Sequence, residues 1–137
     1  MGYDMYCVAE ALNKKSGKWE CFGVSKAERN YSLFSRIADI ANSEDEETYI
    51  EPIEAPRGWP LDVSGPAEAW RDDCSIHFSD TWLCLAELKD LNKLIQGNLW
   101  KMLRLNHLSD FFNLEKGWKK AAFTRYSDLR ILFFFDR

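Results

Sequence analysis

Hydrophobic and polar residues alternate in the first part of the chain in a way that predicts a β-hairpin. Residues 4–12 form a strand-like run, and in residues 18–22 polar and apolar residues alternate. The segment between the two runs ends in Gly17, which can adopt the left-handed conformation that a hairpin loop of this length commonly needs. The sequence therefore predicts two adjacent antiparallel strands at the N-terminus.

The apolar spacing then changes to that of helices. One helical face collects Leu33, Phe34, Ile37, Ala38 and Ala41. This spacing predicts a helix of about three turns that ends near Asn42, with Asn30 or Ser32 as its cap. Shorter helical stretches are predicted at 67–71, where Pro66 suits the first turn, and at 99–105, with a further turn at 108–112.

A leucine stripe predicts another helix, and the residues before it allow two starting points. The stripe consists of Leu85, Leu88, Leu91, Leu94 and Ile95. Asp80 could cap this helix early. Alternatively, Trp82 and Leu83 remain extended, and Cys84 is the cap with Glu87 as its capping-box partner. The preceding residues, 74–78, are predicted to be extended.

The C-terminal run, residues 129–135, is almost continuously apolar, as expected of a strand covered on both faces. Such a strand belongs in the middle of a sheet. The sequence predicts a single α+β domain over residues 1–137, with an antiparallel or mixed sheet that contains the N-terminal hairpin and this central C-terminal strand. The helices are expected to cover the sheet.

All four prolines of the chain lie between Pro52 and Pro66, so neither a long helix nor a central strand fits residues 51–66. Loops of this length in compact domains are commonly functional or disordered. The embedded Ile53, Trp59 and Leu61 favour an ordered loop that packs on the domain.

Composition and charge narrow the functional classes. Hydrophobic residues make up 46% of the 137 residues, which is enough for one core, and the net charge of -4 argues against a broad nucleic-acid surface. Neither a signal peptide nor an apolar run of about 20 residues is present, so a cytoplasmic protein without membrane contact is expected. The four cysteines lie in predicted strands and helices, and we expect free structural thiols.

Several segments together resemble a family of small uncharacterised phage and prophage proteins. They are Arg29-Asn30-Tyr31-Ser32-Leu33-Phe34, residues 56–64 (PRGWPLDVS), residues 77–88 (HFSDTWLCLAEL) and the terminal residues 133–136 (FFFD). The resemblance implies a phage or prophage origin and carries no activity. In the family pattern a Ser or Thr precedes the Leu-x-Glu-Leu helix, whereas Cys84 stands at that position here.

The candidate chemistry centres on the proline loop and the segment after it. Arg57 can hold a carboxylate or phosphate with two hydrogen bonds, and His77 beside Asp80 can be oriented as a general base. Asp62 completes this candidate site. The competing interpretation is structural: Arg57 pairs with Asp62 to hold the loop, and His77 bonds to a backbone carbonyl.

Two weaker candidates involve an anion and a metal. Arg29, Asn30 and Tyr31 precede or open the first long helix, where free N–H groups could bind a phosphate. Alternatively, Asn30 only caps that helix. Cys74 and His77 have metal-ligand chemistry, but no second ligand pair completes a tetrahedral set, so neither a metal nor another cofactor is predicted.

The absence of familiar catalytic motifs favours binding over catalysis. The sequence therefore predicts a phage or prophage accessory protein that binds a host or defence protein, with Arg57, Trp59 and Trp70 in the contact surface. The alternative is a small enzyme or ligand-binding protein that handles a nucleotide or other anion at Arg29, Arg57 and His77. A pocket lined by these three residues would favour the alternative.

Overall fold

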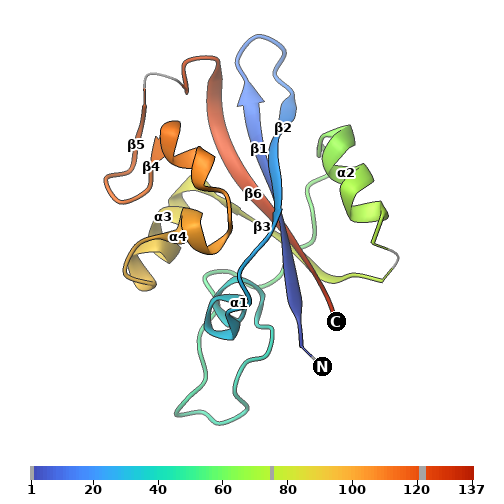
Figure 1. Ribbon diagram of the computed structural model, residues 1–137, viewed down its shortest axis with the longest axis vertical. Coiled ribbons are helices and arrows are strands. Elements are labelled where there is room, and N and C mark those ends of the chain that lie inside the picture. Colours follow the sequence, from blue (N-terminus) through green and yellow to red (C-terminus); the bar gives the residue numbers. More distant parts are fainter. Residues whose placement is uncertain (1, 75, 121–122) are drawn as a thin grey trace.

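A four-stranded antiparallel sheet forms the centre of the computed structural model (Figure 1). The structure describes residues 2–74, 76–120 and 123–137, and of Trp118 only the backbone. The strands are β1 (Asp4–Asn13), β2 (Trp19–Lys26), β3 (Phe78–Cys84) and β6 (Tyr126–Asp136), in the spatial order β2-β1-β6-β3. The predicted hairpin and the central C-terminal strand are both confirmed.

Strand β6 is buried on both faces, which explains its continuous apolar sequence. Its residues point alternately to the two sides of the sheet, as the two-residue period of a strand requires. One side receives Leu129, Ile131, Phe133 and Phe135, together with Met5, Cys7, Ala9 and Ala11 of β1. The other side receives Leu132 and Val8.

The larger core lies on the first of these sides. It is covered by α1 (Tyr31–Ala38), α3 (Leu85–Leu94), α4 (Leu99–Met102) and a short 3-10 helix, η1 (Asn106–Asp110). Leu88 and Leu91 bring the apolar stripe of α3 into this core. No helix among the described residues has the length and apolar character needed to cross a bilayer.

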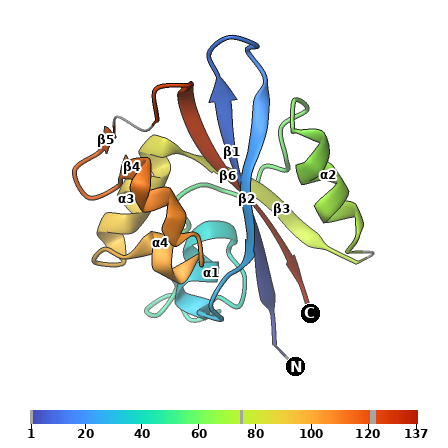
Figure 2. The ribbon, with the colours of Figure 1, turned by 45° about the horizontal axis from the view of Figure 1, so that its top comes forward.

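A smaller layer covers the opposite side of the sheet. It consists of α2 (Gly65–Asp72) and the proline loop before it, and Figures 1 and 2 show α2 across the sheet from α3 and α4. Ala67 is the fully buried residue of α2, and Trp59 and Trp70 pack around it half-buried. The proline loop is thus part of a layer of the fold.

Several predicted boundaries are corrected by local backbone conformation. Helix α1 has two turns instead of three, because Asp39 adopts a left-handed conformation (φ 58) that ends it. Strand β2 continues to Lys26 instead of ending at residue 22. Helix α4 stops at Met102, and Arg104 beyond it is again left-handed (φ 57).

Three further expectations also change. Residues 74, 76 and 77 form bends or irregular chain instead of an extended run, while residue 75 lies outside the described residues. A small hairpin, β4 (Phe112–Asn113) with β5 (Trp118–Lys119), was not predicted. Leu61 does not anchor the proline loop, because its side chain is fully exposed.

The start of α3 follows the second of the two predicted alternatives. Trp82 and Leu83 are extended within β3, and Cys84 is the N-cap residue. The Cys84 backbone N–H donates to Glu87 Oε1 at 2.9 Å, which is the acidic half of a capping box. Cys84 is therefore the residue from which helix α3 begins.

The outer edge of β2 is covered by the segment that follows α4. His107 Nε2 lies 3.0 Å from the Phe22 carbonyl oxygen, and Ser25 Oγ donates to the Leu103 carbonyl at 2.5 Å. A Cβ atom on Gly23 would lie 2.7 Å from the His107 ring, so only glycine permits this approach. The Phe22 and Lys26 carbonyls at this edge are therefore engaged and do not pair with a further strand.

Deleting residues 130–137 should prevent folding, because β6 pairs with both β1 and β3 and contributes to both cores. We expect circular dichroism of the truncated chain to show loss of the native spectrum, or the chain to aggregate. A monomeric truncated chain with a cooperative thermal transition would contradict the central role of β6.

Candidate functional site

A buried ion pair links the two central strands beneath the proline loop. Arg130 of β6 and Glu10 of β1 are direct cross-strand neighbours. Arg130 Nε donates to Glu10 Oε1 at 2.9 Å, and Arg130 Nη2 lies 2.7 Å from the same oxygen. The Glu10 side chain is completely buried, so its charge depends on these contacts for stabilisation.

The same cluster fixes the end of the proline loop. Arg130 Nη1 donates to Asp62 Oδ1 at 3.0 Å, and the Ser64 N–H donates to the other Glu10 oxygen at 2.7 Å. The interpretation that paired Asp62 with Arg57 is therefore wrong, because Arg130 takes that place. These three charged residues, Glu10, Asp62 and Arg130, form a cluster, called here the Arg130 cluster, that holds the end of the loop.

Guanidinium and indole groups alternate along this side of the sheet. The Arg57 guanidinium carbon lies 4.0 Å from the Trp82 ring centre, and that of Arg130 lies 5.9 Å from the same ring. On its other side Arg130 lies 3.9 Å from the Trp19 ring centre. Such cation–π contacts stabilise desolvated guanidinium groups.

Arg57 covers the outer edge of β3. Its Nε and Nη2 atoms donate to the Trp82 carbonyl at 3.1 and 2.6 Å, and Nη2 also lies 2.5 Å from Glu87 Oε1. The neighbouring Gly58 N–H donates to the Asp80 carbonyl at 2.8 Å. Arg57 therefore ties the proline loop to β3 and to the start of α3.

His77 and Asp80 are brought together as the sequence suggested for a general base. His77 Nδ1 lies 2.9 Å from Asp80 Oδ1, and Arg71 Nη1 donates to Asp80 Oδ2 at 3.3 Å. The His77 ring stands edge-on to Phe134 at 5.7 Å. Both carboxylate oxygens are thus occupied, and the arrangement orients the histidine without an adjacent activated nucleophile among the described residues.

Both tryptophans of the predicted contact surface are half-buried. Trp59 Nε1 donates to the Phe133 carbonyl at 2.9 Å, and the Arg71 guanidinium covers its ring at 4.5 Å. Trp70 packs edge-on against Tyr6 and Phe134. These indoles hold the α2 layer on the sheet and present only part of their surface to solvent.

The candidate anion site at the start of α1 is occupied by internal contacts. Asn30 Oδ1 accepts the Leu33 N–H at 3.0 Å and so caps the helix. Arg29 Nη2 lies 2.8 Å from Asp4 Oδ1. The Tyr31 hydroxyl accepts the Tyr3 N–H at 3.1 Å. Arg29, Asn30 and Tyr31 take no part in the hydrogen bonds of the Arg130 cluster.

The surroundings of Cys7 and Cys74 disfavour their thiolate forms. All four cysteines are free, and Cys7 is the fully buried one. Burial raises the pKa of Cys7 to about 12. Burial and the Asp136 carboxylate raise the pKa of Cys74, which disfavours its thiolate. Among the residues that the structure describes, no three His, Cys, Asp or Glu side chains are grouped to hold a metal ion.

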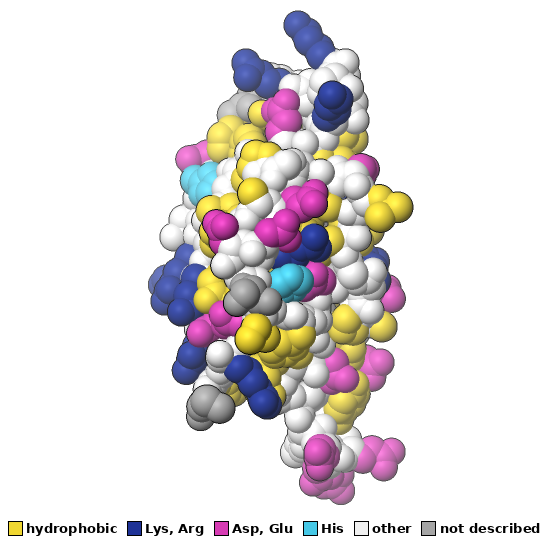
Figure 3. Space-filling view, turned by 90° about the vertical axis from the view of Figure 1, so that its right-hand side faces the viewer, with side chains coloured by type: hydrophobic (Ala, Val, Ile, Leu, Met, Phe, Trp, Pro, Cys, Tyr) yellow, Lys and Arg dark blue, Asp and Glu magenta, His cyan; other side chains and the backbone are white. Residues whose placement is uncertain are grey.

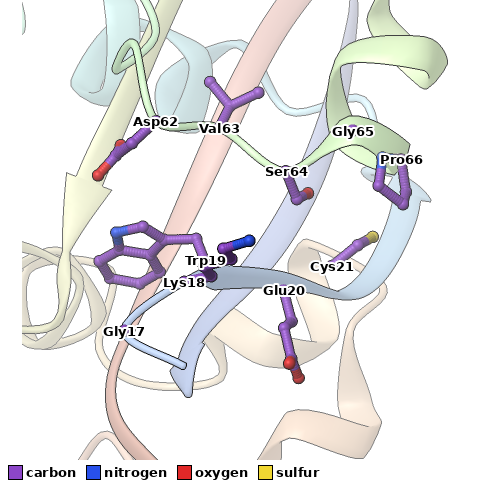
Figure 4. A pocket seen from close by; sticks show the side chains of 10 residues that line it. All are labelled: Gly17, Lys18, Trp19, Glu20, Cys21, Asp62, Val63, Ser64, Gly65 and Pro66. Carbon is purple, nitrogen blue, oxygen red and sulfur yellow. The ribbon is translucent and has the colours of Figure 1, made fainter. Parts of the chain in front are cut away.

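A cavity of about 550 Å³ opens between β2 and the loop that leads into α2 (Figure 4). Trp19 and Cys21 line it from β2, and Asp62 and Ser64 line it from the loop. Figure 4 shows Asp62 pointing from the loop toward Trp19, whereas Glu20 points away from the loop. The cavity thus borders the Arg130 cluster directly.

Sequence reasoning missed Glu10, Arg130 and Trp19. The signal was a charged residue in the interior of each of two largely apolar runs. Glu10 falls in the run 4–12 and Arg130 in the run 129–135, and a buried pair is the stable way to accommodate such charges. The cross-strand register that joins them was not available from the sequence.

Comparisons of the chain with protein-family models, with curated proteins and with solved structures find no match.

The ion pair between Arg57 and Glu87 should make the free energy of unfolding depend on pH. Burial alone would raise the pKa of the Glu87 carboxyl, but the hydrogen bonds from Arg57 and from the Cys84 N–H outweigh it and lower the pKa below its ordinary value of 4.5. A lowered pKa stabilises the fold above pH 4.5, and this contribution disappears as pH falls through the folded-state pKa.

We therefore expect Glu87→Gln to be less stable than the unmodified protein at pH 7, with the difference shrinking below pH 4.5. Urea unfolding across this pH range measures it. Glu115→Gln, at an exposed position outside the pair, is the matched control. A difference between Glu87→Gln and the unmodified protein that stays constant down to pH 3 would contradict the assigned ion pair.

Proposed function

We propose that the chain is a non-enzymatic accessory protein of phage or prophage origin that binds a host or defence protein through the α2 face. This face consists of α2, the end of the proline loop and the segment just before β3. The observation that carries the proposal is the exposure of two aliphatic side chains on it: Leu61 is fully exposed, and Ile76 is 79% exposed. An aliphatic side chain that is exposed in the free protein contributes favourable free energy when a partner removes it from water.

Both exposed residues are presented by fixed backbone. Leu61 precedes Asp62, which is held by Arg130. Ile76 precedes His77, which is held by Asp80, and its carbonyl accepts the Cys74 thiol at 3.4 Å. Because the chain beside each of these residues is anchored before binding, less backbone entropy is lost when a partner covers them.

The charge of the α2 face indicates what kind of partner fits. Its exposed acidic residues are Asp62, Glu68, Asp72 and Asp73. The basic residue of α2, Arg71, is engaged with Asp80. Figure 3 looks onto this side and shows acidic and hydrophobic side chains interspersed. The combination favours a protein surface that carries apolar and basic groups over nucleic acid or anionic lipid.

The pairing of the candidate catalytic groups supports binding over catalysis. Arg57, Asp62 and Arg29 each have an internal ionic partner, and His77 is paired with Asp80. None of these four is among the lining residues of the cavities beside Trp70 or at α3, and only Asp62 lines the cavity at β2. Among the cavities described for residues 2–74, 76–120 and 123–137, none is lined by Arg29, Arg57 and His77 together, which is the arrangement that would favour an anion-handling enzyme.

The test compares an α2-face variant with a matched control on the other side of the sheet. Tagged unmodified protein, Leu61→Asp/Ile76→Asp and Leu94→Asp serve as baits in host lysate, followed by quantitative mass spectrometry. Leu94, which is 50% exposed on α3, controls for adding an acid at an exposed aliphatic position. We expect a partner whose recovery falls about tenfold or more only in the double variant, the loss typical of an anchor pair.

Purified partner is then titrated against all three proteins. Equal recovery and equal affinity for the double variant and the unmodified protein would contradict the proposed face. Failure of the unmodified protein to retain any partner would contradict binding as the function. Thermal melting of each variant confirms that the exposed substitutions leave the fold intact.

A further inference from the structure

We infer that the cavity between β2 and the loop before α2 is a recognition pocket for an arginine side chain of the protein partner. The guanidinium group would stack on the Trp19 ring where it lines the cavity and donate to the carboxylate oxygen of Asp62 that Arg130 leaves unbonded. This inference rests on the proposed function, because it names how part of the partner is recognised. The inference adds a chemical group of the partner, a guanidinium, and the cavity that would bind it, neither of which follows from the exposed Leu61 and Ile76.

The first reason is the stacking order beneath the cavity. Arg57, Trp82, Arg130 and Trp19 follow one another as cation, ring, cation and ring, so Trp19 is the last ring of the series. Arg130 occupies one face of Trp19. Within the part of the chain that the structure describes, no second cation or aromatic ring contacts this indole, which lines the cavity and is partly exposed.

The second reason is the state of Asp62. Its Oδ1 atom accepts from Arg130 Nη1 at 3.0 Å, whereas its Oδ2 atom has no donor among the described residues. The Asp62 side chain is 67% exposed and points toward Trp19 (Figure 4). A carboxylate oxygen and an indole ring that line the same cavity are a combination that a planar guanidinium can satisfy at once, by stacking and by donating.

The cavity is less suited to an anion, although it borders the start of a helix. The Ser64 N–H donates to Glu10, and the Ala67 N–H donates to Ser64 Oγ at 3.3 Å. Pro66 has no N–H to offer. Among the described N–H groups of residues 64–67, these contacts leave only that of Gly65 to donate to an anion. The Asp62 carboxylate would also repel a negative ligand. Lys18 also lines the cavity, but its exposure to water screens its charge.

An ammonium group would use the pocket less well than a guanidinium. Lysine presents a compact charge that is strongly hydrated, whereas arginine presents a flat fork that packs on a ring and is more weakly hydrated. The protein itself stacks arginine, through Arg57 and Arg130, on the indoles of this series. We therefore expect a preference for arginine over lysine, and a strong preference for either over a neutral isostere.

The experiment titrates short capped peptides into isotopically labelled protein and follows the amide and indole resonances by NMR. The probes are acetyl-Gly-Arg-Gly-amide and its lysine and citrulline counterparts. We expect the arginine peptide to shift the Trp19 indole and the Ser64 amide saturably, and the citrulline peptide to bind roughly tenfold more weakly because it lacks the charge. Asp62→Asn should weaken arginine binding by a similar factor, whereas Asp72→Asn, exposed on α2 outside the cavity, should not.

The wild-type comparison of arginine with citrulline decides the matter even if Asp62→Asn disturbs the fold through Arg130. Equal binding of the two peptides, no shift at Trp19, or unchanged binding to a folded Asp62→Asn protein would overturn the inference. A protein that captures its partner through Leu61 and Ile76 but ignores the arginine peptide would leave the proposed function standing and remove only the arginine pocket.

Discussion

The buried pair between Arg130 and Glu10 is the constraint on which the second layer of this protein depends, the layer formed by α2 and the proline loop before it. A carboxylate without solvent must be paired or hydrogen-bonded, and both oxygens of Glu10 are used: one by Arg130 and the other by the Ser64 N–H. The ion pair joins the central strands, and its other hydrogen bonds go to Asp62 and Ser64 at the end of the proline loop. The buried charge of Glu10 is therefore fully hydrogen-bonded only when this loop packs on the sheet.

The surface follows from this anchoring. With Asp62 fixed by Arg130 and Arg57 fixed against Trp82, the loop has two charged attachment points, and Leu61 lies between them in sequence. Because charged hydrogen bonds hold the loop in place, the loop does not need to bury Leu61 to remain attached to the sheet. The same paired charges explain why Arg57, Asp62 and His77, the residues most suggestive of catalysis, serve as attachments.

The sequence predicted the sheet better than the site. The strand-like run at residues 4–12, the alternation in residues 18–22 and the continuous apolarity of residues 129–135 are local signals of strands, so the hairpin and the central strand could be recognised. Helix ends were less accurate, because Asp39 and Arg104 adopt left-handed conformations that no local motif required. The Arg130 cluster could not be assembled, since Glu10 and Arg130 are 120 positions apart and meet only through strand register.

A double-mutant cycle measures the coupling between Glu10 and Arg130. Urea unfolding is measured for Glu10→Gln, Arg130→Met and the combined variant. We expect each single substitution to cost about 3 to 5 kcal/mol, because it leaves an unpaired buried group, and the combined variant to cost clearly less than their sum. Additive losses, or single losses below about 1 kcal/mol, would contradict the claim that this pair holds the second layer in place.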